Sequence, residues 1–168
     1  MGKLLHSNLG EIRPVKSAKE REEFGGGKKG LILCPECQSA YFNKAWHHSN
    51  LKFKGDEDAS VKFMLCPADK MIKNKQYEGK VVVKNVAKEL EGEIINLIKN
   101  IGISAFEKEP MHRLISVGKV RGEIVALTTE NELAVSMAKK IGSAHKKSKV
   151  KITFAKEPSD VAIAVVQF

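Results

Sequence analysis

The chain has 168 residues, the length of one ordinary domain or of a small module joined to a compact domain, and its 42% hydrophobic and 29% charged residues exclude a disordered or fibrous protein. Its 29 Lys and Arg outnumber the 20 Asp and Glu and leave a net charge of +9, which favours polyanionic partners such as nucleic acid. Because no apolar stretch approaches the roughly 18 residues needed to cross a bilayer and the N-terminus lacks the apolar segment of a signal peptide, we expect a soluble cytoplasmic protein without a membrane partner.

Composition divides the chain into three zones. Residues 1–30 are rich in Lys and Arg and end in a run of Gly and Lys over residues 25–30. Fixing the backbone of such a run costs much conformational entropy, so the sequence predicts a flexible basic tail. Residues 31–79 contain all three cysteines and most of the aromatic residues but little aliphatic periodicity, so this segment needs a staple to fold. We interpret it as a zinc-ribbon module and residues 80–168 as an α+β domain.

Residues 80–168 begin with strand and helix patterns. The valines at 81–83 predict a short strand, with Asn85 as a plausible N-cap of the helix that follows. Apolar residues then recur on one helical face as far as Pro110, at Leu90, Ile94, Leu97, Ile98, Ile101 and Ala105. Residues 114–117 and 124–127, which flank two glycines, predict a β-hairpin.

A second helix and two more strands complete this zone. Thr129 and Glu132 have the spacing of a capping box, and they predict a helix with Leu133, Met137, Ile141 and Ala144 on its inner face. Strands are predicted at 150–154 and 161–166. The order β-α-β-β-α-β-β predicts an antiparallel sheet with both helices on one face, an α+β sandwich of ferredoxin-like or related type.

Two short cysteine motifs predict a metal site. The segment Leu33-Cys34-Pro35-Glu36-Cys37 is repeated as Leu65-Cys66-Pro67-Ala68-Asp69, with aspartate in the place of a fourth cysteine. In a cytosolic protein a pair such as Cys34 and Cys37 is more typical of a metal-binding or redox motif than of a disulfide framework. Two tight turns with ligands at i and i+3 place four donors around one tetrahedral zinc ion, namely Cys34, Cys37, Cys66 and Asp69.

The predicted site has two alternatives, a histidine as the fourth ligand or a degenerate motif that binds no metal. His47 or His48 in place of Asp69 makes a site of three cysteines and one histidine, which zinc also accepts. We expect the zinc to be structural, because no general-base motif of the metalloprotease type accompanies the cysteines and because zinc binding contributes directly to the folding of small modules.

Lysine clusters predict contacts with nucleic acid. No acidic residue occurs between Leu133 and Lys156, whereas lysines and one histidine are dense there, beyond what the C-terminus of a helix needs. Aromatic residues interleaved with lysines at 41–77 predict a second contact, since rings and cations together hold bases and phosphates. The predicted nucleic-acid-binding residues are Lys139, Lys140, His145, Lys146, Lys147, Lys149, Lys151, Lys44 and Trp46. We interpret His112 and Arg113 as structural.

The two short motifs at residues 33–37 and 65–69, which we call the first and second knuckle, and the segments that follow them resemble a known family. Cys34-Pro-x-Cys37 with Tyr41, Trp46 and Cys66-Pro67, followed by the stretches 122–134 and 138–142, resembles an uncharacterised bacterial zinc-ribbon family. That family is similar to the N-terminal part of the large-ribosomal-subunit export adaptor of the nonsense-mediated-decay family. The resemblance implies a zinc-stabilised module that docks on the large subunit. The single pair of knuckles and the aspartate depart from the adaptor, so nuclear export does not carry over.

These observations lead to one hypothesis and two competitors. We expect a non-enzymatic zinc-binding protein that docks on the ribosome or on structured rRNA, with no small-molecule substrate, because the phosphate-binding and nucleophile motifs of common enzymes are absent. The alternative is a protein–protein adaptor that uses an exposed edge strand of the α+β domain, such as residues 161–166. The third interpretation is an enzyme in which the thiols of Cys34 and Cys37 react.

Overall fold

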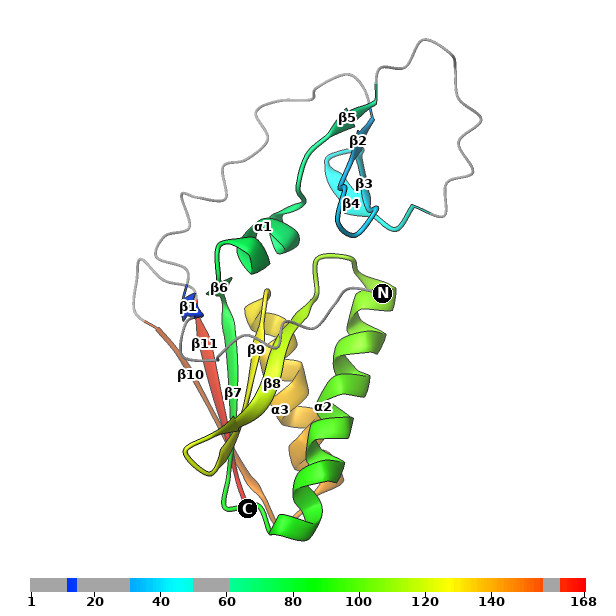
Figure 1. The fold of residues 1–168 in the computed structure, drawn as a ribbon. Coiled ribbons are helices and arrows are strands. Elements are labelled where there is room, and N and C mark those ends of the chain that lie inside the picture. The colour runs from blue at the N-terminus through cyan, green and yellow to red at the C-terminus, as the bar shows by residue number, and fades with distance from the viewer. Residues whose placement is uncertain (1–11, 15–30, 50–60, 156–160) are drawn as a thin grey trace.

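The computed structural model describes residues 12–14, 31–49, 61–155 and 161–168, and it shows a mixed α+β protein (Figure 1). Within these residues there are three helices and eleven strands in three sheets. The rest of the predicted tail, residues 1–11 and 15–30, lies outside the described residues. None of the described helices is long and apolar enough to cross a membrane.

The large sheet belongs to the C-terminal part of the chain and has the predicted order of elements. These are β7 (Gly79–Lys84), α2 (Lys88–Lys108), β8 (Leu114–Val120), β9 (Glu123–Thr128), α3 (Asn131–Ala144), β10 (Lys149–Phe154) and β11 (Ala162–Gln167). Their strands lie in the order β10-β11-β7-β9-β8. Both helices cover one face of this sheet, as the strand and helix pattern predicts (Figure 1).

One strand pair departs from the predicted antiparallel sheet. β11 runs parallel to β7, with Ala164 opposite Val81, while the other three pairs are antiparallel. After α3 the chain forms β10 at the outer position, and the hairpin then returns β11 between β10 and β7. The prediction that residues 161–166 form an exposed edge is therefore wrong, and the edge strands of this sheet are β10 and β8.

The helical periodicity predicts most of the core residues of both helices, but Ala144, predicted on the inner face, is exposed because it is the last residue of α3. Ile94 and Ile98 of α2 and Met137 and Ile141 of α3 are fully buried against Val81 and its neighbours on the sheet. The starts of the helices differ from the prediction. The N-cap of α2 is Ala87, and the N-cap of α3 is Glu130, whose side chain makes no capping hydrogen bond. The hydroxyl of Thr129 does not cap α3 and donates instead to the carbonyl of Met111.

The opposite face of the sheet is partly covered by residues that precede it. Ile12 is only 7% exposed and packs with Val82 and Leu127, and β1 (Arg13–Pro14) pairs in parallel with β6 (Gln76–Tyr77). Residues 12–14 are thus part of the folded structure, so the prediction of a flexible tail over residues 1–30 does not describe them. A buried isoleucine contributes enough apolar contact to hold so short a segment.

The cysteine-containing module has a small sheet of its own. Its strands lie in the order β4-β3-β2-β5, and they are β2 (Ile32–Leu33), β3 (Ala40–Phe42), β4 (Ala45–His47) and β5 (Lys62–Phe63). The short helix α1 (Pro67–Lys73) follows β5 and leads through β6 into β7. Figure 1 shows the module beyond one end of the large sheet, next to the loop between α2 and β8.

Candidate metal centre

The first knuckle is a tight turn between β2 and β3. The amide of Gln38 donates to the carbonyl of Cys34 at 2.9 Å, and the amide of Cys34 donates to the carbonyl of Ser39 at 2.8 Å. Gln38 adopts the left-handed conformation with φ of 62°, which lets the chain reverse within so few residues. The turn therefore brings the side chains of Cys34 and Cys37 together, as the spacing predicts.

The second knuckle is the start of helix α1. Cys66 is the N-cap, Pro67 occupies the first helical turn, and the amide of Asp69 donates to Cys66 Sγ at 3.4 Å. A proline is favoured at this place because its fixed φ suits the helix and its missing amide hydrogen has no partner there anyway. The same turn holds the carboxylate of Asp69 near the positive end of the helix. In the second knuckle the first turn of a helix therefore brings the two side chains together, whereas in the first knuckle a loop turn does so.

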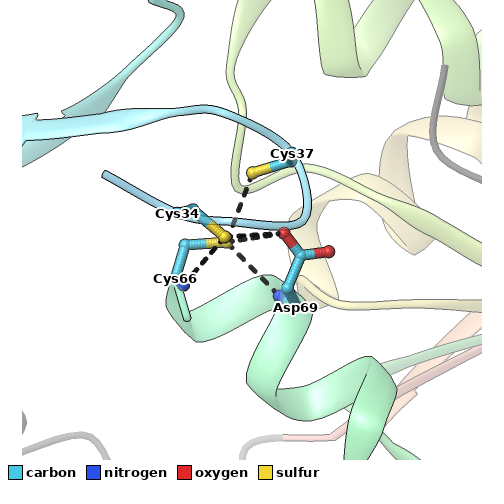
Figure 2. A group of neighbouring side chains, drawn as sticks. All are labelled: Cys34, Cys37, Cys66 and Asp69. Atoms are coloured by element: carbon cyan, nitrogen blue, oxygen red, sulfur yellow. Dashed lines mark hydrogen bonds between the residues drawn. The ribbon is translucent and has the colours of Figure 1, made fainter. Parts of the chain in front are cut away.

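The four predicted ligands form one cluster (Figure 2). Cys34 Sγ and Cys66 Sγ each lie 3.2 Å from Asp69 Oδ2, and Cys37 Sγ lies 3.7 Å from Cys66 Sγ. All four donor atoms lie within 4.8 Å of one another. Tetrahedral zinc with zinc–sulfur bonds of about 2.3 Å keeps its sulfur ligands about 3.8 Å apart, so the donor spacing fits such an ion. The cluster could hold a metal ion.

The four donor groups of the cluster differ in how readily they lose a proton. Hydrogen bonding to Cys66 lowers the pKa of Cys37 to about 6, while the same interaction, together with burial, raises the pKa of Cys66. Burial also raises the pKa of Cys34. Burial opposes the ionisation of Asp69, but hydrogen bonds from Cys37 and Cys66 and the charge of Arg113 lower its pKa. A bound cation displaces the protons that remain on the thiols.

Arg113 connects this cluster to the α+β domain. Its Nη1 lies 3.5 Å from Asp69 Oδ1, and the residue is buried. The guanidinium also stacks on the ring of Phe106, with Cζ 4.4 Å from the ring centroid. Thr129 holds the backbone, because its hydroxyl accepts from the amide of Arg113 at 2.9 Å and its amide donates to the carbonyl of Arg113 at 3.0 Å. Arg113 is therefore structural, as interpreted from the sequence. Its pairing with Asp69 was not predicted, because the two residues are far apart in the chain and no sequence motif connects them.

Neither histidine lies in the metal cluster. The ring of His47 stacks on Phe42 with centroids 4.1 Å apart, and the ring of His48 packs edge-on against Phe106 and hydrogen-bonds to its carbonyl oxygen. The ring of His47 therefore packs within the module, whereas the ring of His48 packs the module against α2. Of the two alternatives for the fourth donor, the structure brings Asp69 to the three thiols.

The predicted nucleic-acid residues fall into exposed and packed groups. The exposed ones are all lysines, namely Lys139, Lys140, Lys146, Lys147, Lys149, Lys151 and Lys44. Trp46 is only 6% exposed and packs on Tyr41 in the core of the module, so its ring offers no free face to a base. His145 is half-buried, with its ring 5.0 Å from that of Phe168. We withdraw Trp46 as a predicted contact.

The exposed lysines of the C-terminal domain surround its β10 edge. Lys149 and Lys151 lie opposite Gln167 and Val165 in the register of β10 and β11, on the face of the sheet away from the helices. Lys139 and Lys140 lie on α3 on the other face, and Lys146 and Lys147 lie in the turn between α3 and β10. The predicted basic patch is therefore a band that wraps around one edge of the sheet.

Comparison with known proteins leaves this chain without an assigned relative: no family model, no curated protein and no solved structure matches it.

Proposed function

We propose that the metal is zinc and that its role is structural. The donor set supports this, because three thiols and one carboxylate complete a tetrahedron and leave no position for a substrate. The module is also too small to fold on its core alone, since its main buried side chains are Ile32, Trp46 and Ala68 beside the cysteines. Such a site needs reduced thiols, which a reducing compartment such as the cytoplasm provides.

We also propose that the protein is non-enzymatic and docks on the ribosome or on structured rRNA. The observation that carries this proposal is the band of exposed lysines around β10. Within the described residues no carboxylate pairs with any of its six lysines, so their charge is available to phosphates. A protein that neutralises several phosphates releases counterions, and its affinity falls steeply with salt.

The experiment is sedimentation of the full-length zinc-loaded protein with ribosomes through sucrose gradients at low and high salt. We expect co-migration with the large subunit at low salt and release at high salt. The double variant Lys146→Glu/Lys147→Glu should be released at lower salt, because each reversal removes a cation and adds a repulsive charge. The matched control Lys119→Glu/Arg121→Glu makes the same charge change on two exposed residues of the β8–β9 hairpin, at the edge of the sheet opposite β10 and outside the predicted contacts.

Two results would contradict docking through this band. The first is a protein that stays at the top of both gradients, and the second is equal loss of co-migration in both double variants. Co-migration that does not respond to salt would instead favour a protein–protein adaptor. The structure disfavours strand addition at residues 161–166 and at β10, because β11 is internal and the edge strand β10 carries Lys149 and Lys151, which discourage it.

A further inference from the structure

The edge of the large sheet exposes an aromatic ring beside the lysine band. Phe154 is the last residue of β10 and is 63% exposed. It shares a face of the strand with Ile152, which packs into the core under α3. An exposed ring beside cations is a candidate contact surface, because its apolar face is open to stacking while the cations can hold neighbouring phosphates.

A hollow separates this ring from helix α3. It has a volume of about 780 Å³, and its lining includes Phe154, Lys139, Lys140 and Glu132. A second hollow of about 290 Å³ shares Glu132 and Lys140 with the first and continues to the C-terminal end of α2. Its lining there adds Lys108 and His112. The two hollows together form a track across α3, from β10 towards α2.

The chemistry of the track fits a single-stranded nucleic acid better than a peptide strand or a duplex. A ring flanked by cations is the arrangement with which proteins stack an unpaired base and hold its neighbouring phosphates. A peptide that extends the sheet is opposed by the lysines of β10. In a duplex the bases stack on each other and cannot reach Phe154. Glu132 repels phosphate but accepts hydrogen bonds from the amino group of a base such as cytosine.

We infer that this track binds single-stranded RNA, with one unpaired base stacked on Phe154 and the adjacent phosphates held by Lys139 and Lys140. This inference rests on the proposed function and deepens it, because it names unpaired nucleotides as the part of the RNA that is bound.

The test measures the affinity of the full-length zinc-loaded protein for a short oligocytidine and for a duplex RNA with the same number of phosphates. Phe154→Leu keeps an apolar side chain but removes the ring, so oligocytidine should bind about 5- to 150-fold more weakly. Phe154→Trp should retain the affinity, and its emission should be quenched by the stacked base. Binding of the duplex should be the same in both variants as in the wild type.

Two further variants localise the contact. Lys139→Gln/Lys140→Gln should reduce the salt dependence of oligocytidine binding by about 0.7 per lost phosphate contact in the log–log slope. Phe63→Leu is the matched comparison, because Phe63 is a 71% exposed ring of the second contact predicted at 41–77 and lines neither hollow. We expect Phe63→Leu to weaken oligocytidine binding less than Phe154→Leu does.

The outcomes separate this inference from the function on which it rests. If the wild type binds the duplex or the ribosome while Phe154→Leu binds oligocytidine as tightly as the wild type, the track is wrong and the docking proposal stands. If Phe63→Leu weakens binding as much as Phe154→Leu, the assignment to this hollow is also wrong. If the wild type binds neither RNA nor ribosomes, both proposals fail together.

Discussion

The carboxylate of Asp69 contacts both the cysteine thiols and the guanidinium of Arg113. One oxygen of its carboxylate lies 3.2 Å from the thiols of Cys34 and Cys66, and the other lies 3.5 Å from Arg113. A cysteine thiolate in this position has a single donor atom, so it could not face the other thiols and pair with the arginine through separate atoms. The aspartate that departs from the four-cysteine pattern is therefore explained by the neighbouring domain, which presents a buried cation to it.

Substitution of Asp69 tests its place among the ligands. In Asp69→Asn the carboxylate is lost, and we expect zinc to bind at least about 10- to 100-fold more weakly, since even changes to the partners of ligands cost this much. Competition with a chromophoric chelator at fixed pH measures the affinity. The control Glu36→Gln neutralises an exposed carboxylate in the first knuckle and should leave the affinity unchanged. An Asp69→Asn protein with wild-type affinity would remove Asp69 from the donor set.

At the scale of elements, helix α2 shows how position decides the effect of a residue. Gly92 and Gly102 both lie inside this continuous helix. A Cβ at Gly92 would meet nothing within 4 Å, whereas a Cβ at Gly102 would lie 2.7 Å from Cβ of Leu114 on β8. Gly102 is therefore required for the close approach of helix and strand, and Gly92 is not.

The two alanine substitutions in α2 should have opposite effects. Gly92→Ala should raise the free energy of unfolding by about 0.5–1 kcal/mol, because alanine loses less conformational freedom in a helix than glycine. Gly102→Ala should lower it by about 1–3 kcal/mol, because the helix must move away from Leu114. Urea denaturation of the two variants checks both values, and each serves as the control for the other. Equal effects would contradict the packing described for Gly102.

At the scale of the whole molecule, the candidate metal site is part of the contact between the cysteine module and the α+β domain. Arg113 reaches Asp69, Met111 packs against the core of the module, and His48 contacts Phe106 at the end of α2. Removal of one partner from a buried ion pair leaves an uncompensated charge, which is costly. Asp69 is held both by the thiol cluster and by Arg113, so removal of a bound metal ion should free its carboxylate from the cluster and loosen this contact as well as the module itself.

Arg113→Met tests this coupling. We expect zinc to bind about 10- to 100-fold more weakly, because Arg113 orients a ligand without being one. Amide hydrogen exchange should also become faster in residues 45–48 and 109–113, as it should in the wild type after chelation. The control Arg121→Met replaces an exposed arginine in the β8–β9 turn and should change neither property. Unchanged zinc affinity and exchange in Arg113→Met would show that the two parts are independent.

The features that the sequence by itself determined are those that depend on local spacing. The repeated Cys-Pro motif predicts two turns whose side chains at i and i+3 converge, and the structure places Cys34 beside Cys37 and Cys66 beside Asp69. The helical period of residues 90–105 and 133–141 predicts which faces of α2 and α3 are buried. Such patterns are reliable because they arise within one or two turns of the same segment.

Only the tertiary structure decided which distant segments meet. It selected Asp69 over the two histidines, placed Arg113 against Asp69, buried Trp46 and inserted β11 between β10 and β7. It also brought Phe154 to the hollow beside α3. The physical reason is that packing and strand pairing between remote residues depend on the shape of the whole chain, which no spacing within a single segment encodes.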